Sequence, residues 1–374
     1  MRRAASPGLP MLMLNMHIDE KREMTDRLTS LLAERPWLLA DGATGSNLFE
    51  RGLQSGDAPE LWNSDHPDRV AELQRAFVEA GSDIILTNSF GGTRHRLKLH
   101  RAEDRVAELN EKAALIARAE ADRADREVLV AGSMGPTGEI LEPLGPLSSD
   151  DARVAFAEQA VALARGGADI LWIETMSSME ESEAAVVGAK STGLPVVATL
   201  SFDTNGRTMM GITPSELTGL HRKHNLAACG SNCGTGPSEL VACIVNLATA
   251  SEPSAVLVAK ANCGIPQFVN GEIRFNGTPE LMAQYACLAL DSGARIIGGC
   301  CGTTPEHVRI MRRALESHVR GPKPDLATIE SKLGAISNGA TAQLRGEFSR
   351  EAGAAAGASG RRTTNRRNAR TQSQ

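Results

Sequence analysis

The stretch Trp37-Leu38-Leu39-Ala40-Asp41-Gly42 shows the pattern that decides the fold: a short apolar run that ends in an acid and a glycine. Similar apolar runs recur along the chain, and each gives way to polar or small residues. There are eight of them, at 37–41, 83–88, 128–132, 169–174, 195–201, 226–232, 255–262 and 295–299. Continuous apolar runs of this length are typical of parallel strands that are covered on both faces of a sheet.

Segments with the apolar spacing of helices separate most of these runs. They lie at 68–80, 102–123, 149–165, 179–189, 214–223 and 279–291. Thr213-Pro214, Thr278-Pro279 and Thr304-Pro305 each place a capping hydroxyl before a proline at a first helical position. Eight strand units within about 265 residues predict a single-domain (β/α)8 TIM barrel. An open doubly wound sheet is the alternative, but no predicted strand is followed by a Gly-x-Gly-x-x-Gly turn.

The barrel is expected to occupy residues 24–323. Helical spacing of leucines is found over 20–34, and Pro36 ends this predicted helix. Residues 1–23 are expected to form a loose extension, and its interrupted apolar run does not fit a signal peptide. The sequence leaves open whether translation starts at Met1 or Met24. Residues 324–374 are expected to be a weakly structured to disordered basic tail, because they offer little to bury.

Composition indicates a globular protein that acts on a small molecule. The net charge is −5 and the sequence pI is about 6.0, so neither nucleic acid nor a membrane surface is an expected partner. No apolar run approaches the roughly 18 residues that a membrane helix needs. The seven cysteines lack the dense spacing of a disulfide scaffold, which favours a reducing compartment and a cytoplasmic location. The sequence does not indicate an oligomeric state.

Two adjacent cysteines stand out in Gly298-Gly299-Cys300-Cys301-Gly302-Thr303, directly after the last predicted strand. They fit chance burial, a strained redox-active disulfide, or two thiolate ligands of a metal. Zinc is the metal that best fits thiolates, and three protein thiolates would leave its fourth position open. The third ligand would be Cys233 or Cys263, which both lie in Asn-Cys-Gly turns. We favour Cys233, because its turn follows its strand directly.

Active sites of such barrels lie at the carboxyl ends of the strands, where several polar residues are expected. The set is Asp41, Asn88, Ser133, Glu174, Asp203, Cys233, Asn262, Cys300 and Cys301. A zinc ion with three thiolates suits the capture of a further thiol as thiolate, which predicts alkylation of sulfur. Asp41 and Glu174 could hold a substrate ammonium, and the amides of Gly42 and Ala43 its carboxylate. Alternatively, the two acids cap the helices that follow them.

Six motifs together resemble the zinc-dependent homocysteine S-methyltransferases over about residues 37–315. They are Asp-Gly-Ala-Thr-Gly at 41–45, Thr-Asn-Ser-Phe at 87–90, Gly-Pro-Thr-Gly at 135–138, Glu-Thr at 174–175, Gly-Ser-Asn-Cys at 230–233 and Gly-Gly-Cys-Cys-Gly-Thr at 298–303. The resemblance implies a (β/α)8 barrel with Cys233, Cys300 and Cys301 as zinc ligands, rather than Cys263. It also implies that Asp41, Gly42 and Glu174 bind L-homocysteine, that methionine is the product, and that no catalytic group is needed beyond the zinc-activated substrate thiolate.

The methyl donor of such relatives is glycine betaine, S-methylmethionine, or methylcobalamin with methyltetrahydrofolate. The chain is most similar to bacterial betaine-homocysteine S-methyltransferases, which favours glycine betaine or another onium donor. Thr175 and Gly91 stand where the animal enzyme has aromatic residues of its donor cage. A cation cage would therefore use Trp62, Phe90 or Trp172, and Trp62 is the donor-site candidate. Outside this class, a zinc or thiol redox sensor on a barrel is the rival hypothesis.

Overall fold

The computed structural model describes residues 27–269 and 272–347, so the predicted N-terminal extension and the Arg-rich end of the tail lie outside the described residues. Each of the eight predicted runs overlaps a strand. In chain order these are β1 (Leu38–Leu39), β2 (Ile84–Leu86), β3 (Leu129–Met134), β4 (Ile170–Met176), β5 (Val196–Leu200), β6 (Ala228–Cys233), β7 (Leu257–Ala261) and β10 (Ala294–Gly299).

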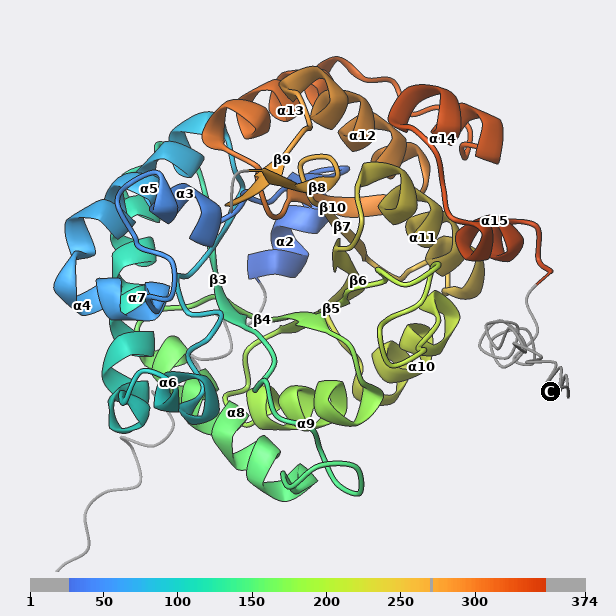
Figure 1. Cartoon of the computed structure of the whole chain (residues 1–374). Coiled ribbons are helices and arrows are strands. Elements are labelled where there is room, and N and C mark those ends of the chain that lie inside the picture. The colour runs from blue at the N-terminus through green and yellow to red at the C-terminus, as the bar shows by residue number, and fades with distance from the viewer. Residues whose placement is uncertain (1–26, 270–271, 348–374) are drawn as a thin grey trace, which may run out of the picture.

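The strands form one parallel sheet in the order β1-β10-β7-β6-β5-β4-β3-β2. Its two edges meet through a parallel bridge between Ala40 and Ile84. The Asp41 amide donates to the Ile84 carbonyl at 3.0 Å, and the Asp83 amide donates to the Leu39 carbonyl at 2.6 Å. The sheet therefore closes on itself, as seen in Figure 1, and the predicted (β/α)8 barrel is confirmed.

Helices surround the strands in an outer ring (Figure 1). The main ones are α5 (Pro67–Ala80), α7 (Val106–Ala121), α8 (Ser149–Arg165), α9 (Met179–Lys190), α10 (Pro214–His224), α11 (Pro237–Ala250), α12 (Pro279–Asp291) and α13 (Pro305–Ser317). The predicted caps form at Thr213 and Thr278, whose side chains accept from the Glu216 and Leu281 amides. No helix of the described residues is both long enough and apolar enough to cross a membrane.

Shorter elements lie in the loops at the carboxyl ends of the strands. They are α3 (Gly45–Phe49), η1 (Pro59–Leu61), α4 (Trp62–Asp65), α6 (Arg94–Lys98), η2 (Glu103–Arg105) and an antiparallel hairpin of β8 (Pro266–Val269) and β9 (Glu272–Phe275). The apolar spacing did not predict this hairpin, which is inserted between β7 and α12. Its Phe275 lies against the loop that carries the adjacent cysteines.

Two further helices follow Pro324, in the region expected to be weakly structured. α14 (Leu326–Leu333) packs on α11 and α12, and α15 (Asn338–Leu344) packs on α11. Each buries few side chains, among them Ile329 and Ala340, so their sequence pattern is faint. They cover the outer face of α11, which explains why that helix is apolar nearly all round and lacks a visible helical period.

Helix α2 (Arg27–Glu34) closes the amino-terminal end of the barrel and lies at the centre of the ring in Figure 1. Leu28, Leu31 and Leu32 pack against inward-facing strand residues such as Ile170. The Arg295 side chain donates to carbonyls at the end of α2 and just beyond it. Because α2 fills the amino-terminal end of the barrel, the carboxyl ends of the strands are the place for a functional site.

Truncating a buried side chain of α2 is expected to lower the stability of the fold. Leu31 is 2% exposed, so Leu31→Ala should lower the free energy of unfolding by about 2–5 kcal/mol through lost burial and a residual cavity. Denaturant titration would measure it, with Ser30→Ala on the exposed face of α2 as the matched control. Equal unfolding midpoints for the two variants would contradict the assigned role of α2.

Candidate metal and substrate site

The structure brings Cys233, Cys300 and Cys301 together at the carboxyl ends of β6 and β10. The Cys233 sulfur lies 3.1 Å from that of Cys300 and 3.8 Å from that of Cys301, and all three lie within 4.8 Å of one another. Cys263 is placed differently: it is 1% exposed, and its sulfur faces the Gly277 carbonyl at 3.4 Å. The cluster thus contains the three predicted ligands and leaves out Cys263.

A strained backbone conformation at Cys233 sets the direction of its side chain. Cys233 has φ of 59°, in the left-handed region that side-chain-bearing residues rarely adopt. Two contacts hold the turn: the Gly234 amide donates to Ser201 Oγ at 3.2 Å, and the Asn232 side chain pairs with Thr175. Thr175 is itself left-handed, with φ of 62°. Strain of this kind persists only where the surroundings impose it, which is typical of functional turns.

The loop that carries Cys300 and Cys301 is held by hydrogen bonds from its amides to the end of β7 and to the side chain of Asn262, the next residue. The Cys300 amide donates to the Ala261 carbonyl at 2.6 Å, and the Cys301 amide donates to Asn262 Oδ1 at 3.1 Å. Gly302 has φ of 78°, and a Cβ there would lie 2.5 Å from the Phe275 ring. The glycine after the two cysteines is therefore needed for both conformation and space.

The sulfur cluster cannot carry three negative charges without a cation. Hydrogen bonds from Cys233 and Cys300 lower the pKa of Cys301 to about 4. The hydrogen bond from Cys233 lowers the pKa of Cys300. The hydrogen bond between Cys300 and Cys301, together with burial, outweighs this effect and raises the pKa of Cys300 to about 12. The pKa of Cys233 is raised by its hydrogen bonds to both neighbours. One thiolate is thus favoured, and the other two would ionise beside a bound metal ion.

Lys260, which the sequence reading overlooked, lies beside this cluster. It is on β7 and 1% exposed, and its Nζ lies 2.7 Å from Asp41 Oδ1 and 5.5 Å from the Trp172 ring centre. Burial lowers the pKa of Lys260, but the negative charges of Asp41 and Glu174 outweigh burial and raise the pKa above its usual value. The ammonium therefore stays protonated. The sequence did contain a signal for this residue: a lysine within the apolar run Leu257–Ala261. A charge buried in a strand requires a partner, so such a lysine indicates a buried charged site.

Asp41 lies behind the cavity rather than in its wall. It is 0% exposed, and its second carboxylate oxygen accepts from the Leu86 amide at 2.7 Å. Burial raises the pKa of Asp41, although Lys260 opposes this. Both carboxylate oxygens of Asp41 therefore have hydrogen-bond partners within the protein, Lys260 for one and the Leu86 amide for the other.

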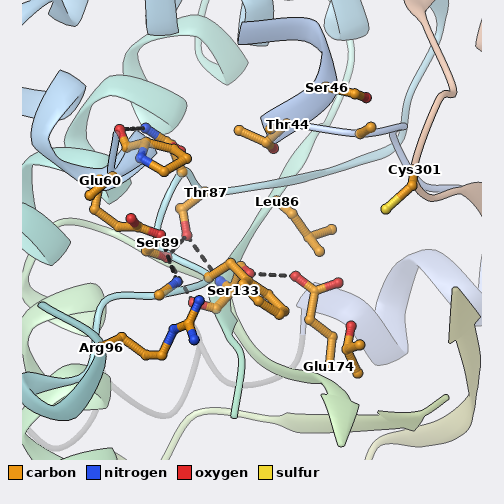
Figure 2. Close-up of a pocket in the computed structure, with 18 of the residues that line it drawn as sticks. Thr44, Ser46, Glu60, Leu86, Thr87, Ser89, Arg96, Ser133, Glu174 and Cys301 are labelled. Carbon is orange, nitrogen blue, oxygen red and sulfur yellow. Dashed lines mark hydrogen bonds between the residues drawn. The ribbon is translucent and has the colours of Figure 1, made fainter. Parts of the chain in front are cut away.

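Glu174 is the predicted acid that faces the cavity. Ser133 Oγ donates a short hydrogen bond to its carboxylate, as Figure 2 shows. Burial raises the pKa of Glu174 to about 7, with Lys260 opposing the shift and Cys300 adding to it. Gly42 also lines the cavity, but the Ala43 amide does not remain free as expected, since it donates to the Thr303 carbonyl at 3.1 Å.

The cavity has a volume of about 470 Å³, which suits small substrates. One part of its wall is formed by the three cysteines, Glu174 and Lys260. Another part is formed by Phe90, Glu60 and Arg96 from the loops after β1 and β2. In Figure 2, Glu60 and Arg96 lie on one side of Ser133, and Glu174 and Cys301 lie on the other.

The structure does not bring Trp62 to this cavity. The ring is 6% exposed in the core, with the Arg69 guanidinium 5.1 Å from its centre and His66 against its edge. Pro59 and Glu60 of the same segment face the cavity instead. Trp172 is fully buried, so Phe90 is the single phenylalanine, tyrosine or tryptophan that lines the cavity among the described residues.

The fold and the site define a class: (β/α)8 barrels with a cluster of three cysteines at the carboxyl ends of their strands. Within it, the chain belongs to the homocysteine S-methyltransferase family, whose sequence model matches residues 38–315.

Curated relatives agree with this family. Methionine synthase of Mycobacterium tuberculosis is 30% identical over 313 residues, covering 79% of this chain and 26% of that protein. Methionine synthase of Mycobacterium leprae is 30% identical over 305 residues, covering 77% of this chain and 25% of that protein. The chain therefore spans about a quarter of the length of these relatives.

Solved structures of the Escherichia coli homocysteine methyltransferase MmuM are also similar. The metallated form has a TM-score of 0.64 at 23% identity, covering 76% of this chain and 99% of that chain. The oxidized form has a TM-score of 0.61 at 26% identity, covering 76% and 98%.

Proposed function

We propose that this protein is a zinc-dependent methyltransferase that moves a methyl group from an onium donor, with glycine betaine favoured, to the thiolate of L-homocysteine, giving methionine. The observation that carries the proposal is the convergence of Cys233, Cys300 and Cys301 with the buried acid Glu174 on one cavity. A thiol redox sensor would not need such an acid beside its cysteines. A reducing compartment such as the cytoplasm would keep the three thiols available.

The sulfur geometry fits zinc. Zn–S bonds of about 2.3 Å at tetrahedral angles place sulfur atoms about 3.8 Å apart. The Cys233–Cys301 separation is 3.8 Å, and the shorter Cys233–Cys300 separation of 3.1 Å would open slightly. The MmuM structure solved in a metallated form supports a metal in a related barrel. When bound, zinc would lower the pKa of a further thiol and keep it as the reactive thiolate at neutral pH.

The residues around the sulfur cluster would orient homocysteine. The Glu174 carboxylate would accept a hydrogen bond from the substrate ammonium. The hydrogen bond from Ser133 would hold the Glu174 carboxylate in place. Lys260, fixed by Asp41, carries a positive charge that acts on Glu174 and would limit the build-up of negative charge around the thiolates. Because these groups are buried, their interactions with the substrate are screened less than at the surface.

Removing the charge of Glu174 is expected to weaken homocysteine binding and to spare the metal. Glu174→Gln keeps the size of the side chain, so zinc content should stay near one per chain. Homocysteine affinity should fall by about 2–5 kcal/mol, the cost of losing one partner of a desolvated charge pair. Calorimetric titration would measure the affinity, with the exposed Glu139→Gln as the matched control. Unchanged affinity in Glu174→Gln would refute the assignment.

The donor assignment rests on what lines the cavity beyond Glu174. Phe90 offers an aromatic face and Glu60 a carboxylate, which are the groups that attract a quaternary ammonium or a sulfonium. S-methylmethionine would satisfy the same groups. Methylcobalamin or methyltetrahydrofolate is the alternative donor. The similarity to proteins named methionine synthase is the reason to test this alternative.

Product analysis tests the proposal. Zinc-loaded protein would be incubated with L-homocysteine and, separately, glycine betaine, S-methylmethionine and methylcobalamin, and methionine would be measured by mass spectrometry. We expect methionine from glycine betaine without cobalamin or folate, and none from Cys301→Ser. Methionine from methylcobalamin alone would overturn the donor and keep the homocysteine assignment. No methionine with any donor would overturn the proposed function.

A further inference from the structure

Arg96 lines the cavity without a partner for its charge. It lies on α6, is half-buried, and its side chain forms no hydrogen bond or ion pair within the described part of the chain. A guanidinium carries five N–H donors in a planar fork that matches a carboxylate. Most other half-buried arginines of the described residues are paired, for example Arg118 with Asp169 and Arg312 with Asp83. The free fork of Arg96 therefore indicates a ligand.

Buried amide side chains hold the loop that presents Arg96. Asn63 and Gln159 donate to the Asn88 and Ser89 carbonyls at 2.8 and 2.7 Å, and Asn110 donates to the Gly92 carbonyl at 2.9 Å. The Thr93 side chain then caps α6 by accepting from the Arg96 amide. These hydrogen bonds hold the loop in one conformation and so pre-organise the position of Arg96.

Glu60 lies close enough for Arg96 to act on its charge but does not neutralise the guanidinium. Its Oε1 accepts from the Gly91 amide at 2.6 Å, and no ion pair joins it to Arg96. Burial raises the pKa of Glu60, and the nearby Arg96 and His100 oppose this. This part of the wall thus offers a carboxylate and a free guanidinium side by side, which is complementary to a zwitterion.

We propose that Arg96 binds the carboxylate of the methyl donor and so selects onium donors that carry one. This inference rests on the proposed function and names the substrate class of the same cavity. The onium group would then lie by Phe90 and Glu60, with its methyl group toward the cysteines. The homocysteine thiolate supplies the electron pair for the new S–C bond. The donor nitrogen keeps the pair of the broken C–N bond and leaves as a neutral tertiary amine, so no further reactant is needed.

The test compares donors with and without a carboxylate in wild type, Arg96→Gln and Arg96→Lys. Glycine betaine is paired with tetramethylammonium, and dimethylsulfoniopropionate with trimethylsulfonium. Loss of a charged hydrogen-bond pair should lower kcat/KM for the two carboxylate donors about 10–100-fold in Arg96→Gln. Donors without a carboxylate should be poor for wild type and unaffected by the change. Arg96→Lys should recover part of the loss, and Lys98→Gln, on the exposed side of α6, should match wild type.

Equilibrium binding separates this inference from the proposed function. Glycine betaine titrated into zinc-loaded protein should bind more weakly in Arg96→Gln by a similar factor, whether or not turnover occurs, while homocysteine affinity stays within about twofold. Equal use of both donor types by wild type, or an equal loss for both in Arg96→Gln, would overturn the inference. Absence of homocysteine binding and of methionine with every donor would instead overturn the proposed function.

Discussion

Protein in which Cys233, Cys300 or Cys301 is replaced by serine is expected to lose nearly all of its zinc, while wild type holds about one zinc per chain. Thiolate zinc sites bind with about 10–16 kcal/mol in total, so loss of one ligand of three removes several kcal/mol. A serine hydroxyl does not ionise near neutral pH and cannot replace the thiolate. Metal analysis of dialysed protein by mass spectrometry would measure the zinc content.

Cys263→Ser is the matched control for this experiment. Its sulfur lies against the Gly277 carbonyl and outside the cluster, so this variant should keep its zinc. Loss of zinc from Cys263→Ser together with its retention by Cys233→Ser would show that the ligand assignment is wrong.

Replacing Lys260 with methionine is expected to destabilise the barrel by about 3–5 kcal/mol, the cost of leaving a buried charge without its partner. Asp41, at 0% exposure, would remain beside Glu174 and the cysteines without the ammonium that pairs with it. This loss is a large share of a typical domain stability of about 5–15 kcal/mol. Denaturant unfolding of the zinc-loaded protein would measure it.

A double variant distinguishes loss of the charge pair from loss of packing. Lys260→Met with Asp41→Asn removes both charges and should recover part of the stability. Lys112→Met, which breaks an exposed pair with Glu108, should change the free energy of unfolding by less than about 1 kcal/mol. If Lys260→Met were as stable as Lys112→Met, the buried pair would not have the role assigned to it.

The sequence predicted the barrel well, because parallel strands covered on both faces have continuous apolar runs that are visible without tertiary information. It did not reveal α11, because helices α14 and α15 cover its outer face and remove the polar side that marks a helical period. The β8–β9 hairpin was missed for a related reason. It is an insertion into one strand-to-helix loop and does not follow the repeat.

The candidate site was predicted in part. Adjacent cysteines after one strand and an Asn-Cys-Gly turn after another indicated the sulfur cluster, which the structure assembles. The direction of side chains was harder to predict, because it depends on packing between distant segments. Asp41 turns inward to Lys260, and Trp62 packs into the core while its neighbour Glu60 reaches the cavity. Such choices follow from burial and charge pairing rather than from position along a loop.

Calorimetric titration of L-homocysteine in buffers of different ionisation enthalpy tests most directly the central claim, that the three cysteines and Glu174 form a homocysteine site. Zinc-loaded protein should bind one homocysteine per chain and release about one proton, because the free thiol, with a pKa of roughly 8.5, would be held as thiolate. Zinc-free protein and Cys301→Ser should bind far more weakly. Equal homocysteine binding with and without zinc, or binding without proton release, would contradict the account.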